Sequence, residues 1–171
     1  MRALLVVLAV ASCGAREQRH SYRDAGLSLY SNAVFDPARL QGEWAQVAAF
    51  QRPNGGRCSG GGAEFGALGP EGRLRLDASL CLSGKTERFS GMVDVPASGR
   101  LVLSGADPKG IGQAWWVLWA DVDNRTLLIG TPSGDFGFIL NRGGRLPADR
   151  LTAARDILEW NGYDLTELRV F

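Results

Sequence analysis

The feature that most constrains this chain is a series of eight short segments with an apolar, strand-like pattern. They cover residues 42–50, 63–68, 73–78, 87–95, 100–104, 114–121, 126–130 and 135–141. Turn-forming residues separate them, among them Gly69-Pro70-Glu71-Gly72 and Asp123-Asn124. Short strands at even spacing, joined by tight turns, are typical of an antiparallel β-sandwich or β-barrel.

After the eighth segment the spacing of the apolar residues changes. They recur at the period of a helix at Leu151, Ala154, Ile157 and Leu158. Pro147 lies near the start of this pattern, and Asn161-Gly162 follows its end, as expected for a helix start and stop. The pattern predicts one amphipathic helix packed outside the sheet, followed by a short closing strand over residues 168–171.

The single histidine and the balanced charge exclude several functions. A zinc motif with two histidines is impossible, and a Ser-His-Asp or Cys-His mechanism would have to use His20, which precedes the first strand. The formal net charge is +1, so the chain lacks the basic footprint of a nucleic-acid-binding protein. We therefore predict that the chain is not an enzyme and that it has no metal, cofactor or nucleic-acid partner.

The N-terminus has the pattern of a secretory signal. Met1-Arg2 precedes nine apolar residues, which are too few to span a bilayer because a spanning helix needs roughly 20. The sequence 10–13 (Val-Ala-Ser-Cys) resembles the bacterial lipobox, whose cysteine becomes the lipidated first residue. This predicts a signal peptide over 1–12, a lipidated Cys13, and a polar tether that extends to residue 33. Plain secretion, with cleavage near Ala11 or Gly14, is the alternative.

Lipidation of Cys13 would attach the chain lastingly to a membrane, because each buried methylene contributes about 0.8 kcal/mol. Gly14 follows the cysteine, and by resemblance to lipoprotein sorting this favours the outer membrane, with the protein facing the periplasm. A soluble periplasmic or secreted protein is the alternative location.

The two remaining cysteines, Cys58 and Cys81, are 23 residues apart. An even number of cysteines in an oxidising compartment favours a disulfide, which would contribute roughly 3 kcal/mol on the chain-entropy model. Two free buried thiols are the alternative.

Five segments together resemble one family. Gly42-Glu43-Trp44 resembles the G-x-W signature that opens the first strand of lipocalins, and a predicted helical turn at residues 36–40 precedes it, as in that family. Residues 115–121, 130–136, 138–142 and 158–164 resemble, in the same order, segments of bacterial lipocalins of the outer-membrane lipoprotein type, which are related to apolipoprotein D. The resemblance implies a lipocalin domain over 34–171, that is, an all-β, eight-stranded, up-and-down antiparallel barrel with one C-terminal helix outside.

The resemblance also assigns structural roles. In the family an arginine at the end of the eighth strand stacks over the signature tryptophan, which implies that Arg142 lies over Trp44. Such a stack contributes about 0.5–2 kcal/mol. Asp135 occupies the acidic position of the family's Thr/Pro-x-x-Asp-Tyr segment, where Phe136 here replaces the tyrosine.

A barrel of eight strands has an interior just wide enough for one small ligand. The resemblance places Trp116, Leu118 and Phe138 inward, and further candidates for the lining are Phe50, Phe65, Leu74, Leu76 and Phe89. Ordinary core packing is the alternative for each. Burying about 300 Å² of a lipid tail would gain about 7–8 kcal/mol before entropic costs. A polar headgroup would meet Arg52, Arg57 or Lys109 at the open mouth.

We therefore expect a monomer or weak dimer that binds, stores or transports a hydrophobic small molecule, a fatty acid or a lysophospholipid, at the bacterial cell envelope. Two alternatives stay open. The first is an envelope barrel that acts through its loops as an inhibitor or scaffold. The second is a lipid-modifying enzyme related to lipocalins.

Overall fold

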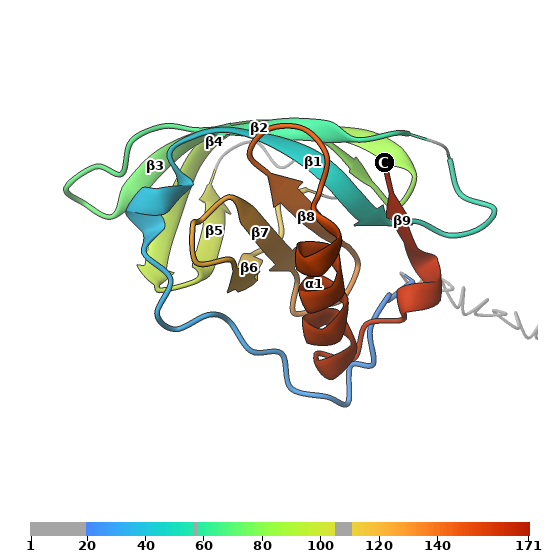
Figure 1. Cartoon of the computed structure of the whole chain (residues 1–171). Coiled ribbons are helices and arrows are strands. Elements are labelled where there is room, and N and C mark those ends of the chain that lie inside the picture. Colours follow the sequence, from blue (N-terminus) through green and yellow to red (C-terminus); the bar gives the residue numbers. More distant parts are fainter. Residues whose placement is uncertain (1–19, 57, 105–110) are drawn as a thin grey trace, which may run out of the picture.

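The computed structural model describes residues 20–56, 58–104 and 111–171, and a closed antiparallel β-barrel accounts for most of them (Figure 1). Its strands are β1 (Gly42–Phe50), β2 (Gly61–Phe65), β3 (Arg73–Leu82), β4 (Lys85–Ala97), β5 (Arg100–Ser104), β6 (Trp115–Ala120), β7 (Thr126–Gly130) and β8 (Gly137–Asn141). Each strand pairs with the next along the chain, and β1 pairs with both β2 and β8. The predicted eight-stranded barrel is therefore confirmed.

Three short elements complete the barrel. A 3-10 turn, η1 (Pro37–Leu40), precedes β1, and the side chain of Asp36 accepts a hydrogen bond from the backbone N–H of Ala38 at 3.0 Å. A second 3-10 turn, η2 (Leu165–Glu167), leads into β9 (Leu168–Val170). This last strand pairs with the second half of β1, beyond the residues that pair with β2. Both the capped turn and the closing strand are as predicted.

The hairpin between β3 and β4 shows how two residues can turn the chain. Ser83 and Gly84 have φ values of 51° and 82°, and positive φ at both central residues is the requirement of a type I′ turn. Gly84 also meets Gly56 of the β1–β2 loop so closely that a Cβ there would lie 2.2 Å from the Gly56 carbonyl oxygen. The strands extend to the turn itself, and are longer than the sequence predicts.

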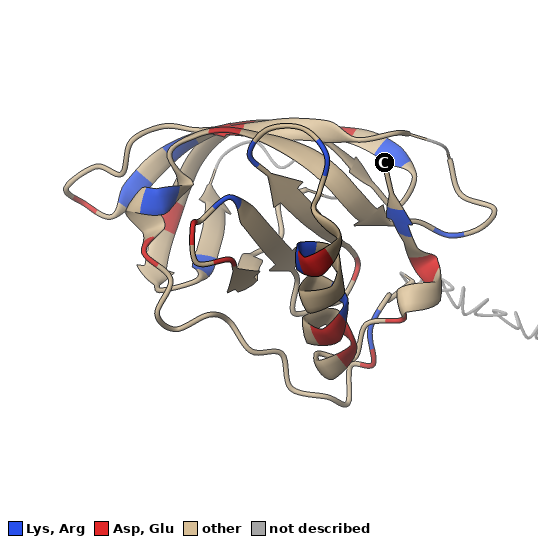
Figure 2. Ribbon diagram, in the orientation of Figure 1, with Lys and Arg blue, Asp and Glu red and all other residues tan. Residues whose placement is uncertain are grey.

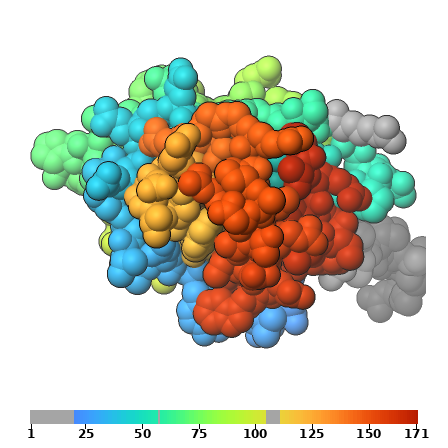
Figure 3. Space-filling view, in the orientation of Figure 1, coloured from blue at the N-terminus to red at the C-terminus, as the bar shows by residue number. Residues whose placement is uncertain are grey.

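The predicted helix, α1 (Ala148–Trp160), packs on the outside of the barrel, where its buried residues Ala154 and Leu158 meet the strands. Figure 3 shows α1 beside the N-terminal segment on one face of the molecule. In the part of the chain that is described, no helix has the length and apolar character needed to cross a membrane. Charged residues of both signs are intermixed over strands, loops and helix (Figure 2).

The buried apolar side chains form two clusters on opposite faces of the barrel wall. The interior cluster contains Phe35, Leu40, Trp44, Ala49, Ala63, Phe65, Leu74, Leu76, Ala78, Leu80, Leu82, Phe89, Val93, Leu101, Ile111, Trp115, Val117, Leu127, Ile129, Phe136, Phe138 and Leu140. The helix cluster contains Tyr22, Val47, Ala48, Phe50, Leu118, Leu128, Ile139, Leu146, Ala154, Leu158, Tyr163 and Leu168. Alternate residues of one strand therefore belong to different clusters, one inside the barrel and one under the helix.

The prediction that Trp116 and Leu118 of β6 point into the barrel is wrong. Trp115 and Val117 belong to the interior cluster, whereas Leu118 belongs to the helix cluster and Trp116 packs against it. Because α1 covers the outer face here, both faces of β6 are apolar, and the alternation that would reveal the phase is lost. A one-residue shift in phase then exchanges the two faces.

Phe50 is likewise on the outer side, in the helix cluster, where its ring lies 4.9 Å from that of Tyr163. The pairing of β1 with β8 shifts between Gln46 and Ala48, which marks a bulge. One extra residue reverses the facing of every later residue, so Ala49 points inward and Phe50 outward.

Candidate functional site

The candidate site is the interior of the barrel. Of the predicted lining residues, the structure places Phe65, Leu76, Phe89 and Phe138 in the interior cluster, together with Leu74. It removes Trp116, Leu118 and Phe50 from the interior. The resulting wall is apolar, contains several aromatic rings, and receives side chains from all eight strands.

Three aromatic residues of the interior cluster were not predicted to line it: Phe35, Phe136 and Trp115. Trp115 is the most deeply enclosed of them. Its ring meets that of Phe138 edge-on at a centroid distance of 5.2 Å. Its indole N–H donates a hydrogen bond of 3.1 Å to the carbonyl oxygen of Ile111, which is also in the interior cluster. A buried indole N–H needs such a partner, so the β5–β6 loop is held at the wall by the tryptophan.

The end of the barrel near η1 is closed by the predicted stack. The Arg142 guanidinium lies 3.9 Å from the centroid of the Trp44 ring, and the Trp44 indole N–H donates to the carbonyl of Leu40 at 2.7 Å. Arg142 also donates to the carbonyls of Arg39 and Gln41 at 2.8 and 2.6 Å. Partial burial lowers the pKa of Arg142, which stays charged at neutral pH.

Gly42 explains the first position of the G-x-W signature. Its φ is +106°, a backbone conformation that favours glycine, and a Cβ there would lie 3.0 Å from Nη1 of Arg142. A side chain at this position would therefore strain the backbone and press on the guanidinium that covers Trp44.

At the opposite end, side chains join loops from different hairpins. The hydroxyl of Ser83, in the β3–β4 turn, donates to the carbonyl of Asp135 in the β7–β8 loop at 3.1 Å. Gln113, in the β5–β6 loop, donates to Asp135 Oδ2 at 2.5 Å and accepts from the hydroxyl of Ser133. The β3–β4 and β7–β8 hairpins lie on opposite sides of an eight-stranded barrel, so the Ser83 bond crosses this end. We call it the open end, in contrast to the end that the arginine–tryptophan stack seals.

The predicted disulfide between Cys58 and Cys81 is present and ties the β1–β2 loop to β3. Two glutamines support it. Gln46 pairs with both the N–H and the carbonyl of Cys81, at 2.7 and 2.9 Å, and Gln51 donates to the carbonyl of Cys58 at 3.1 Å. Of the proposed headgroup contacts, Arg52 is exposed in this loop, while Arg57 and Lys109 lie outside the described residues.

The N-terminal segment is anchored near the same end. Arg23 is buried, and its guanidinium donates to the carbonyls of Asn161 and Pro132 at 3.2 and 3.1 Å. The Tyr163 hydroxyl accepts from the N–H of Thr131 at 3.0 Å, at the start of the β7–β8 loop. Burial raises the pKa of Tyr163 to about 12. The described part of the predicted tether therefore packs against the barrel, which no sequence pattern indicated.

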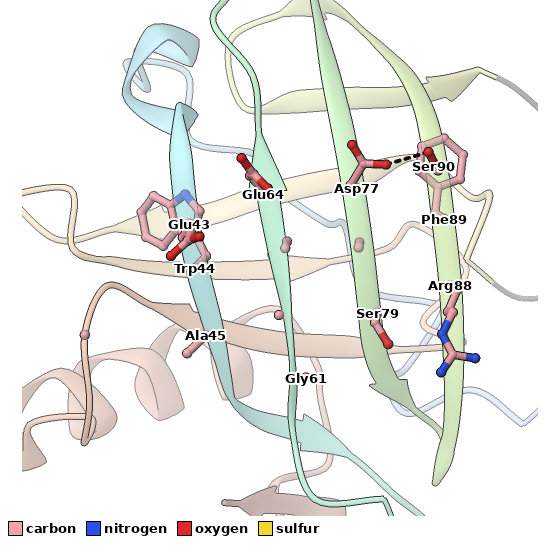
Figure 4. Close-up of a pocket in the computed structure, with 14 residues that line it drawn as sticks. Glu43, Trp44, Ala45, Gly61, Glu64, Asp77, Ser79, Arg88, Phe89 and Ser90 are labelled. Atoms are coloured by element: carbon pink, nitrogen blue, oxygen red, sulfur yellow. Dashed lines mark hydrogen bonds between the residues drawn. The ribbon is translucent and has the colours of Figure 1, made fainter.

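A hollow of about 840 Å³ lies on the outer face of β1 to β4 (Figure 4). Glu43, Glu64 and Asp77 occupy directly opposed positions on neighbouring strands along it. Hydrogen bonds from Arg75 and Ser90 lower the pKa of Asp77. Adjacent like charges disfavour one another, and these pairings compensate part of that cost.

The geometry defines a class of protein: a closed eight-stranded antiparallel barrel with an apolar interior, one end sealed by an arginine–tryptophan stack, and one helix outside. The sequence model of the family described as "Lipocalin-like domain" matches residues 35–171, and the chain belongs to this family. No curated protein matches the chain.

Solved structures of low sequence identity share this fold. Insecticyanin from the tobacco hornworm Manduca sexta is 16% identical, with a TM-score of 0.59, and the match covers 88% of this chain and 85% of insecticyanin. Lobster apocrustacyanin A1 is 14% identical, with a TM-score of 0.57 and coverages of 79% and 78%. The siderocalin Ex-FABP is 12% identical, with a TM-score of 0.56 and coverages of 78% and 93%.

Proposed function

We propose that this protein binds a small hydrophobic molecule, a single-chain lipid such as a fatty acid or a lysophospholipid, in the interior of its barrel. One observation carries the proposal: all eight strands direct apolar and aromatic side chains toward the interior of the closed barrel. Binding there removes apolar ligand surface from water, which is the main driving force for such sites. The family supports the proposal, and Ex-FABP, which shares the fold, is described as a siderocalin with dual ligand specificities.

Tryptophan fluorescence tests the proposal, because adjacent tryptophans lie on opposite faces of β6. Lipids added to the protein should quench fluorescence saturably, and Trp115→Phe should remove much of the quenching. The matched variant Trp116→Phe changes the outer face and should retain it. No saturable quenching by any lipid would remove the carrier function and favour an inhibitor or scaffold that acts through its loops. Turnover of a bound lipid would instead identify an enzyme.

We also propose that the protein functions at a bacterial cell envelope, anchored through lipid on Cys13. The support is the signal-like pattern of residues 1–12 and the lipobox-like sequence that ends at the cysteine. Cys13 itself lies outside the described residues. In a bacterial host, Cys13→Ser should move the protein from the membrane fraction to the soluble periplasm. Unchanged fractionation would favour secretion without an anchor.

A further inference from the structure

Strand β4 brings two charged side chains to the interior side of the barrel wall. Glu87 is paired directly opposite Leu80 of β3, and Phe89 is paired opposite Ala78. Leu80, Ala78 and Phe89 all belong to the interior cluster. Because residues at i and i+2 of a strand, and residues directly opposed across a pair, share a face, Glu87 and Lys85 lie on the interior face as well.

The two inward charges differ in their surroundings. Lys85 is the first residue of β4, next to the turn at the open end, and its side chain is exposed. Glu87 lies two residues deeper, and it is partly buried. The polarity of this face therefore falls along the strand, from an exposed cation through a half-buried carboxylate to the buried ring of Phe89.

The other charged residues of the described barrel strands lie on the outer face. Arg73 and Asp94 pair with each other there at 2.7 Å, and Arg100 stacks on Trp116 outside the wall. Among the described residues, no hydrogen bond or ion pair joins Glu87 to another side chain. A partly buried carboxylate that has no hydrogen-bond or ion-pair partner is unfavourable, and a cationic group in direct contact with it would offset that cost.

We propose that Glu87 selects single-chain amphiphiles whose polar group is positively charged, with the hydrocarbon chain directed toward Trp44. This inference rests on the proposed function, and of the ligands proposed there it disfavours the fatty acid and favours single-chain lipids that carry a cationic group. A carboxylate headgroup at the same depth would meet Glu87 as a like charge. Lys85 offers it little compensation, because an exposed ion pair contributes little to binding.

Three probes with the same hydrocarbon chain test the selectivity: dodecyltrimethylammonium, dodecanol and dodecanoate, titrated below their micelle concentrations by calorimetry. We expect the ammonium to bind most tightly and the carboxylate most weakly, with dissociation constants that differ by about tenfold or more, as expected for one charge contact in a partly buried site. Glu87→Gln should bring the three constants to within about threefold of one another while leaving dodecanol nearly unchanged.

Glu64→Gln is the matched control and should preserve the wild-type order, because Glu64 lies between Ala63 and Phe65 of the interior cluster and therefore faces outward. Lys85→Gln should also preserve the order. If dodecanol does not bind to the wild type, the barrel is no lipid carrier, and both proposals fail. If dodecanol binds but dodecanoate equals or exceeds the ammonium, or if Lys85 rather than Glu87 sets the order, only the proposed selectivity is wrong.

Discussion

The two ends of the barrel are closed by different kinds of interaction. At the η1 end, the Trp44 indole, which is 2% exposed, fills the end of the barrel, and the Arg142 guanidinium covers it while donating to three backbone carbonyls. At the other end, hydrogen bonds of Ser83, Gln113 and Asp135 join three loops. The first closure combines burial, charge and backbone contacts, whereas the second depends on separate polar contacts.

This difference indicates that the two ends of the barrel have different roles. A net hydrogen bond contributes about 0.5–1.5 kcal/mol, so the contacts between the loops can break one at a time. Removing a buried tryptophan lowers the free energy of unfolding by several times more, because loss of the ring creates a cavity. We infer that the η1 end maintains the barrel. A ligand would pass through the opposite end, where Ser83, Gln113 and Asp135 lie.

The largest effect is expected at the sealed end. Trp44→Ala should lower the free energy of unfolding by about 3–5 kcal/mol, since the substitution empties a buried site and leaves Arg142 without its ring. Denaturant unfolding measures this loss. Trp160→Ala is the control, because Trp160 is 66% exposed, and it should change stability by less than about 1 kcal/mol. Equal losses in the two variants would contradict the difference between the ends.

A smaller effect is expected where the β7–β8 loop meets the helix cluster. Tyr163→Phe removes the acceptor of the Thr131 N–H, which should lower stability by about 1–3 kcal/mol in denaturant unfolding. Leu165→Ala, on η2, provides a comparison for general loosening of this region, since it leaves the Tyr163 hydroxyl in place. Stability of Tyr163→Phe equal to that of the wild type would show that the hydroxyl does not hold the loop.

The same tyrosine predicts an alkaline transition. Its folded pKa, about 12, lies above its ordinary value of 10, so the folded state favours the neutral phenol. The resulting stability is fully present below pH 10 and is lost as the pH rises through 12, a decrease on the order of 2 kcal/mol. Unfolding measured from pH 9 to 12 should show this decrease in the wild type and less of it in Tyr163→Phe.

The sequence predicted those parts of the molecule that local patterns specify. Gly42, Trp44 and Arg142 stand at fixed places in a signature, and the strands, the outer helix and the disulfide follow from spacing and residue type. Turn residues and the alternation of apolar and polar residues are local signals, so they can be interpreted without knowing which strands or helices pack against the segment. The sealed end of the barrel was therefore predictable almost residue by residue.

The open end and the phase of the wall were not predictable in this way. Trp115 and Trp116 are adjacent and alike, and only the position of α1 decides which of them faces outward. The bulge after Gln46 leaves no mark in the sequence, yet it reverses Phe50. Glu87 could have been found, because it precedes Phe89 by two residues in a predicted strand, so a correct inward Phe89 places it inward too.

The smallest effect on stability, and the most direct test of passage, is expected at the bond across the open end. Ser83→Gly removes the hydroxyl that reaches Asp135 and keeps the positive φ of the turn, which glycine adopts readily. Stability should fall by less than about 1.5 kcal/mol. Association of a neutral probe, N-phenyl-1-naphthylamine, followed by stopped-flow fluorescence, should become several-fold faster because one barrier to opening is gone.

Ser79→Ala provides the comparison. Ser79 lies between Ala78 and Leu80 of the interior cluster and therefore faces outward, so its substitution should leave the association rate unchanged. The rate, rather than the affinity, is the informative quantity. A contact between loops that must part for entry slows association and dissociation together, whereas a contact with the ligand changes mainly dissociation. Equal association rates in Ser83→Gly and the wild type would show that the ligand does not cross this bond, and that the loops merely stabilise the rim.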